Sequence, residues 1–234
     1  MIGLVLLAVT WLLLRLEGQP LAAIGLDKGW QRSAEGVAGF VFMGFAATVQ
    51  QLGHAAAAGD AFRVNDALQP AALLDGLRFV VNSVLFEELL FRGYLLFQAV
   101  RWLGHRRAVW LDAAVFGAYH WFSYGVIGNP VAMAYVLVMT GAVGLMLARA
   151  FVATGSVVAP IGLHLGWNAV TYLVFSAGPQ GAVLLVPAGG AGRVQAGGIA
   201  GVALNMVWPL LVVAVAIWCC RRYERVTAPA AGPA

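Results

Sequence analysis

The sequence predicts an all-α integral membrane protein, a bundle of about seven transmembrane helices in a range of roughly six to eight. Of the 234 residues, 62% are hydrophobic and only 10% are charged, and the mean hydropathy is +0.84. A water-soluble domain carries about 25% charged residues, so this chain lacks the polar side chains to cover a soluble surface. We therefore expect a single transmembrane domain over residues 1–234.

Apolar stretches separated by loops with turn residues define the expected spans. A helix needs about 20 apolar residues to cross a hydrocarbon core of about 30 Å. The stretch 71–100 would measure about 45 Å as one helix, so we expect it to tilt or to protrude. The Gly- and Pro-rich segment 178–198 has the composition of a re-entrant or interfacial loop. In chain order, the expected spans are 1–15, 34–55, 71–100, 108–124, 130–150, 156–177 and 200–220.

The basic residues fall mainly on one side of this arrangement. The opposite loops hold Arg63 and Arg193 together with Asp60 and Asp66. Loops rich in Lys and Arg stay in the cytoplasm, so we expect a cytoplasmic C-terminus. Basic residues at span ends serve membrane orientation and do not indicate a nucleic-acid partner. The rich side carries Arg15, Lys28, Arg32, Arg101, Arg106, Arg107, Arg149, Arg221, Arg222 and Arg225.

Ionisable side chains inside the expected spans are costly to bury in lipid, and they therefore indicate a functional site. The first cluster contains Glu87, Glu88 and Arg92. Glu88 and Arg92 are four residues apart, on one helix face and in the favoured order for an ion pair. A purely structural pair explains them well. Glu87 is rotated by about 100° from Glu88 and needs a different partner, which favours a functional role.

Two further clusters lie in later spans. His120 lies in the stretch 108–124, and His164 and Asn168 lie in the stretch 156–177. The spacing of four residues places His164 and Asn168 on one helix face, one turn apart. Taken singly, each cluster is explained equally well by hydrogen bonds inside a helical bundle.

Together the clusters supply the groups that acid–base hydrolysis requires. A carboxylate can take a proton from water, an imidazole can orient that water, and N–H groups can stabilise an oxyanion. The sequence has no His-Glu-x-x-His zinc motif and no Gly-x-Ser-x-Gly nucleophile elbow. A metal held by Glu87, His120 and His164 is chemically allowed, since these are competent zinc ligands.

In their order along the chain, the three clusters resemble the CAAX-protease and bacteriocin-processing family, which includes the type II CAAX prenyl endopeptidases. The family pattern is Glu-Glu-x-x-x-Arg, then Phe-x-x-x-His, then His-x-x-x-Asn, on successive helices. Phe116 stands four residues before His120, so every position of the pattern is matched. The resemblance covers about residues 75–175, which we expect to form the catalytic core.

The resemblance implies an intramembrane glutamate-dependent endopeptidase, a hydrolase that cleaves a membrane-associated peptide or protein. It implies that Glu87 and His120 activate the water. It also implies that His164 and Asn168 form the oxyanion hole. No cofactor beyond the catalytic water is implied, although a divalent metal stays open.

The resemblance further implies that Glu88 and Arg92 support the site, Arg92 by orienting a carboxylate. The partners expected for the chain are its peptide substrate and the lipid bilayer. Its Ala-, Gly- and Arg-rich composition suggests a bacterial protein, and hence the bacterial cytoplasmic membrane.

Two other functions compete with the peptidase. A non-catalytic scaffold or chaperone would keep the polar clusters as structural contacts, and a small proton-coupled transporter would use them as a proton relay. A transporter favours inverted repeats, which the sequence lacks, although Pro160 can interrupt a helix. The peptidase requires Glu87, His120, His164 and Asn168 to lie within about 10 Å of one another, in one cavity open to the cytoplasm or to lipid.

Overall fold

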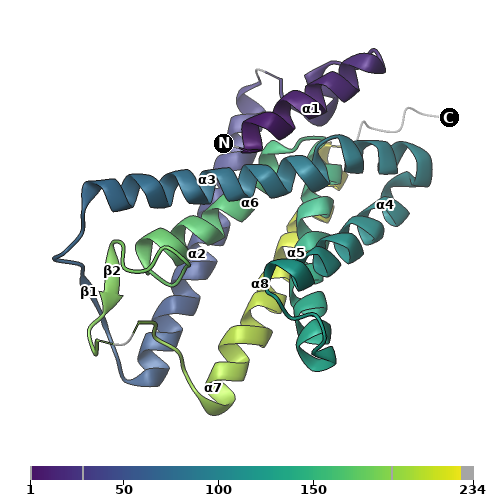
Figure 1. The fold of residues 1–234 in the computed structure, drawn as a ribbon. Helices are drawn as coiled ribbons and strands as arrows, with labels where there is room; N and C mark the ends of the chain where they lie inside the picture. The colour runs from purple at the N-terminus through teal and green to yellow at the C-terminus, as the bar shows by residue number, and fades with distance from the viewer. Residues whose placement is uncertain (1, 28, 191, 228–234) are drawn as a thin grey trace.

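The computed structural model describes residues 2–27, 29–190 and 192–227, most of which are helical (Figure 1). Short helical segments join the longer helices, namely η1 (Leu21–Ile24) and the π-helices η2 (Ala169–Val174) and η3 (Ala203–Val207). The predicted all-α fold is confirmed. The α-helices are α1 (Ile2–Leu16), α2 (Trp30–Ala58), α3 (Pro70–Arg92), α4 (Tyr94–Ser123), α5 (Pro130–Thr154), α6 (Val158–Asn168), α7 (Gly198–Val202) and α8 (Trp208–Thr227).

Three helical stretches of the described chain are long and apolar enough to cross a membrane, Trp30–Ala58, Pro130–Thr154 and Gly198–Thr227. Large apolar side chains are exposed on the outside of the bundle, among them Phe45 and Val131, at 68% and 81%. Such side chains are stable in contact with the lipid of a bilayer, whereas a water-soluble protein rarely exposes so many of them. These features are those of an integral membrane protein, while the number of seven spans stays a prediction.

The prediction of one continuous helix over 71–100 is wrong, because the helix breaks at Gly93. The backbone there has φ −76° and ψ −121°, so α3 ends at Arg92 and α4 begins at Tyr94. A Cβ at this position would lie 2.3 Å from the carbonyl oxygen of Leu89, which only glycine avoids. The first polar cluster therefore lies in the last turns of α3, next to this break.

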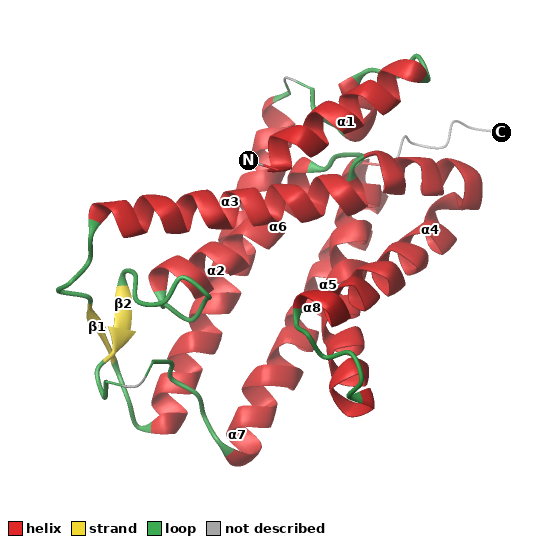
Figure 2. Ribbon diagram, in the orientation of Figure 1, coloured by secondary structure: helices red, strands yellow, loops and turns green. Residues whose placement is uncertain are grey.

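Two short strands lie at one end of the helical bundle (Figure 2). Strands β1 (Phe62–Val64) and β2 (Leu185–Pro187) pair antiparallel, with Arg63 opposite Val186. The segment 178–198, expected to be a re-entrant or interfacial loop, thus folds against the connection between α2 and α3. The Phe62 ring meets the Phe175 ring edge-on at 4.8 Å, which ties this ribbon to the end of η2.

Glycines allow α6 to lie directly on α2, and these two helices run side by side in Figure 1. A Cβ at Gly162 would lie 2.0 Å from the carbonyl oxygen of Gly36, and one at Gly166 would lie 2.2 Å from that of Phe40. Small residues permit this approach in membrane proteins, where packing and not the hydrophobic effect joins helices. The contact fixes the position of α6, the helix that carries His164 and Asn168.

Replacing Gly166 by Ala is expected to push α6 away from α2. Overpacking of this kind costs about 1–3 kcal/mol, against a gain in helix propensity of at most about 1 kcal/mol. Thermal unfolding of the purified protein in detergent should show the loss. Gly197→Ala is the matched control, because no atom lies within 4 Å of its Cβ position. Equal stability of the two variants would contradict the close contact.

Candidate active site

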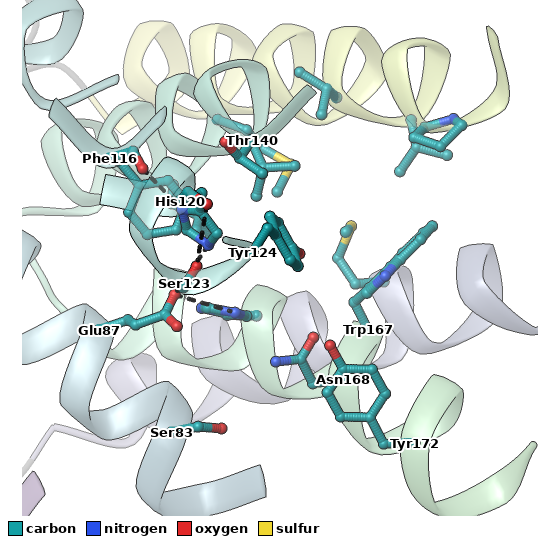
Figure 3. Close-up of a pocket in the computed structure, with 18 of the residues that line it drawn as sticks. Ser83, Glu87, Phe116, His120, Ser123, Tyr124, Thr140, Trp167, Asn168 and Tyr172 are labelled. Carbon is teal, nitrogen blue, oxygen red and sulfur yellow. Dashed lines mark hydrogen bonds and ion pairs between the residues drawn. The ribbon is translucent and has the colours of Figure 1, made fainter. Parts of the chain in front are cut away.

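The structure brings Glu87, His120, His164 and Asn168 to the wall of one cavity of about 280 Å³. Glu87 comes from α3, His120 from α4, and His164 and Asn168 from α6. Figure 3 shows Glu87 and His120 facing each other, with Asn168 projecting into the same space. Side chains from three helices that are far apart in sequence therefore meet in one place.

Glu87 lies between the two imidazoles without touching either. Its Oε2 is 3.9 Å from His120 Nε2 and 4.0 Å from His164 Nε2. These separations are too long for direct hydrogen bonds, whose N···O distances are about 2.7–3.2 Å. One water molecule at about 2.8 Å from each atom fits between them. Within the described residues, the structure gives the Glu87 carboxylate no hydrogen bond of its own, so it is free to accept one.

Hydrogen bonds on the far side of each ring determine how the imidazoles face the cavity. His120 Nδ1 lies 2.7 Å from the carbonyl oxygen of Phe116, and His164 Nδ1 lies 2.7 Å from Glu88 Oε1. A carbonyl or ionised carboxylate oxygen only accepts, so each Nδ1 carries a proton and donates it. In a neutral ring, Nε2 is then an unprotonated acceptor directed at Glu87.

A buried ion network lies behind the site. Arg92 and Glu88 have no exposed surface, and Arg92 Nη1 is 3.4 Å from Glu88 Oε1. Arg92 Nη2 is 2.9 Å from Asp112 Oδ2, an ion pair without hydrogen-bond alignment, and it donates to the carbonyl oxygen of Gly144 at 3.2 Å. The guanidinium also lies 4.2 Å from the centre of the Phe116 ring. Arg92 therefore connects α3 to α4 and α5.

The two adjacent glutamates of the first motif thus lie in different surroundings. Glu88 points into the network and contacts His164, while Glu87 lines the cavity. The ion pair expected between Glu88 and Arg92 is confirmed. Glu88 and Arg92 themselves do not line the cavity; Glu88 contacts it through His164 and Arg92 through Phe116.

Sequence reasoning missed three residues that the structure places in or near the site. Asp112 completes the network, and Tyr124 and Tyr172 line the cavity beside the motif residues (Figure 3). The two tyrosines could have been predicted from their spacing. Tyr124 follows His120 by four residues and Tyr172 follows Asn168 by four, so each continues the helix face of the motif residue before it. Asp112 had a signal too, because it is the only acidic residue in the stretch 108–124.

Within the described residues, no group of three His, Cys, Asp or Glu side chains is arranged to hold a metal ion. Zinc holds nitrogen and oxygen ligands at about 2.0–2.2 Å, which brings neighbouring ligand atoms to about 3.3 Å of each other. Glu87 and the two imidazoles are farther apart than this, at 3.9 and 4.0 Å. In this arrangement, their spacing fits a water molecule better than a zinc ion.

One protein-family model matches the segment that carries these residues. The family model described as "Type II CAAX prenyl endopeptidase Rce1-like" matches residues 69–170, a segment that contains all three motifs. Comparisons with curated proteins and with solved structures gave no match. The family match confirms the resemblance drawn from the sequence.

Removing the Arg92 guanidinium should strongly destabilise the fold, because Arg92→Ala leaves the buried Asp112 carboxylate without a counter-charge. Breaking a buried pair in this way costs about 3–5 kcal/mol. The check is thermal unfolding in detergent beside Arg101→Ala, whose ion pair with Glu17 is 2.8 Å long and 47% exposed on the arginine. The surface variant should lose about 0–1 kcal/mol. A loss as small for Arg92→Ala would mean that the network carries no stability.

Proposed function

Because residues 69–170 match the family model of Rce1-like type II CAAX prenyl endopeptidases, we propose that this membrane protein is an endopeptidase in which Glu87 activates a water molecule. Protease activity follows from the family, and the glutamate-dependent mechanism is our proposal. The observation that carries it is the position of Glu87 Oε2, within 4.0 Å of both His120 Nε2 and His164 Nε2.

The proton count at the site assigns different tasks to the two histidines. A water between Glu87, His120 and His164 has two hydrogens for three acceptors, so it can bond to all three only if one of these groups holds a further proton. His164 suits that proton best, because the Glu88 carboxylate behind its ring balances the charge at 2.7 Å. His120, backed by a neutral carbonyl, then stays an acceptor.

Ionic balance in the buried network supports this assignment. Glu88 and Asp112 carry two negative charges, and Arg92 supplies one positive charge. A protonated His164 makes the group of four neutral. A neutral set is the least costly to keep in a low-dielectric interior.

In the proposed reaction, the water donates one hydrogen bond to Glu87 and one to His120, and its oxygen attacks the carbonyl carbon of the scissile bond. Its proton passes to the Glu87 carboxylate. The negative charge that develops on the carbonyl oxygen receives hydrogen bonds from His164 Nε2–H and from the Asn168 amide. Protonated Glu87 then gives its proton to the leaving nitrogen, the C–N bond breaks, and a carboxylic acid and an amine result.

The substrate that we propose is a peptide or protein held at a membrane. Apolar side chains such as Met43, Met146 and Val213 line the cavity alongside the polar groups. They favour a scissile bond flanked by apolar residues. The composition of the chain supports a bacterial cytoplasmic membrane as its location.

Replacing Glu87 by Gln should lower kcat about 10²–10⁴-fold, because the amide keeps the size of the side chain but cannot accept the proton. The measurement is cleavage of membrane-tethered peptides by the purified protein, with and without a strong chelator. Asp75→Asn is the matched control, since this carboxylate lies on the same helix, exposed and paired with Arg78. We expect the control to keep wild-type activity and the chelator to have no effect.

Three results would overturn this mechanism. Loss of wild-type activity to the chelator would replace the glutamate base with a metal held by Glu87, His120 and His164. Wild-type cleavage that Glu87→Gln retains in full would exclude a glutamate base. A folded wild type that cleaves none of the peptides would favour the scaffold.

Truncating Asn168 to Ala should lower kcat about 10²–10³-fold with little change in KM, because the lost amide donor acts on the transition state. Its side chain has no hydrogen bond to another described residue, so its removal leaves no buried partner unsatisfied. Gln195→Ala, an exposed amide outside the cavity, is the control. A change in KM alone would place Asn168 in substrate binding and not in the oxyanion hole.

A further inference from the structure

The catalytic cavity continues into a larger chamber. This chamber has a volume of about 770 Å³ and shares Tyr124, Trp167 and Tyr172 with the cavity around Glu87. The two spaces therefore adjoin.

The walls of the chamber come from one end of the bundle. They include Val126 in the loop after α4, Ser176 after η2, Arg193 after β2, and Asn205 in η3. The same end holds the β1–β2 ribbon and the end of α2, where Gln50 donates to the carbonyl oxygen of Leu204 at 2.8 Å. We call it the ribbon end.

The opposite end is rich in arginine. It joins the start of α2, the end of α5 and the end of α8, where Arg32 donates to the carbonyl oxygen of Thr154 at 2.5 Å and Arg149 pairs with Glu224 at 2.7 Å. Arg106 and Arg107 also lie at this end, in α4 directly after its kink at Gly104. By contrast, the loops of the ribbon end hold Arg63 and Arg193.

From this asymmetry we propose that the catalytic cavity receives its substrate from the extracytoplasmic face of the membrane. Loops rich in Lys and Arg stay in the cytoplasm, so the arginine-rich end lies inside and the ribbon end lies outside. The chamber lies on the ribbon-end side of the catalytic groups, because loop residues of that end line it. From the sequence, the cavity is expected to open to the cytoplasm or to lipid. With the arginine-rich end in the cytoplasm, the position of the chamber replaces the cytoplasmic opening by an outward one.

This orientation defines a class of substrate, an inference that rests on the proposed peptidase function. The substrate is a peptide whose scissile bond is exposed at the outer leaflet, such as the membrane-proximal part of an exported or translocated chain. A lipid-modified tail displayed in the cytoplasm lies on the wrong side of the bilayer to enter the chamber. The direction of the opening itself does not depend on catalysis, so the two can be tested apart.

Thiol labelling of the full chain in cells tests the direction. The two native cysteines, Cys219 and Cys220, are first replaced by Ala, and single cysteines are then introduced. Arg193→Cys reports the mouth of the chamber, and His105→Cys, in an exposed position, reports the arginine-rich end. Val64→Cys on β1, where the wild-type side chain is 67% exposed, reports the ribbon end if Arg193→Cys fails to accumulate.

A membrane-impermeant maleimide should label the ribbon-end cysteine in intact cells and His105→Cys only after the membrane is opened. A cytosolic thiol protein serves as the control for leakage. Labelling of His105→Cys in intact cells, with the ribbon-end cysteine protected, would overturn the proposal.

A tethered reporter peptide, anchored on either face of the membrane, adds the catalytic readout. Cleavage restricted to the outer reporter supports the proposal, and cleavage restricted to the inner reporter overturns it. Outward labelling without cleavage of either reporter, or of peptides by purified protein, would leave the direction intact and refute the peptidase function instead.

Discussion

The fold around the site depends on one buried cation. The Arg92 guanidinium has no exposed surface, and it lies between the carboxylates of Glu88 and Asp112 and below the Phe116 ring. A charge removed from water must be compensated at short range, so the elements that carry its partners are held to one arrangement. Glu88 extends that arrangement to a fourth helix through its contact with His164.

The geometry of the cavity follows from that network and from one property of the helix. Consecutive residues differ by about 100° in direction, so when Glu88 faces the buried cation, Glu87 must face elsewhere. Glu87 faces the cavity, where the Nε2 atoms of His120 and His164 lie within 4.0 Å of its Oε2. The glycine contact between α2 and α6 completes the arrangement, because it sets where His164 and Asn168 lie. Structural and reactive carboxylates are thereby separated by a single residue in sequence.

Much of this arrangement is predictable from the sequence, because it depends on local spacing. The four-residue interval predicts the Glu88–Arg92 pair, and composition predicts helices in a bilayer. The break at Gly93 is not predictable in the same way. It lies inside an apolar run, and the conformation depends on the close approach of Leu89 and of Thr10 from α1. The pairing of β1 with β2, and the end at which the chamber lies, likewise depend on contacts between distant segments.

The most direct measurement is an experimental structure of the protein with a phosphonate peptide, whose tetrahedral phosphorus imitates the attacked carbonyl carbon. Our mechanism predicts one phosphonate oxygen in the place of the attacking water, within hydrogen-bond distance of Glu87 and His120. A second oxygen should accept hydrogen bonds from His164 and Asn168. A phosphonate bound away from Glu87, or one whose oxygens bind a metal held by Glu87 and the two histidines, would contradict it.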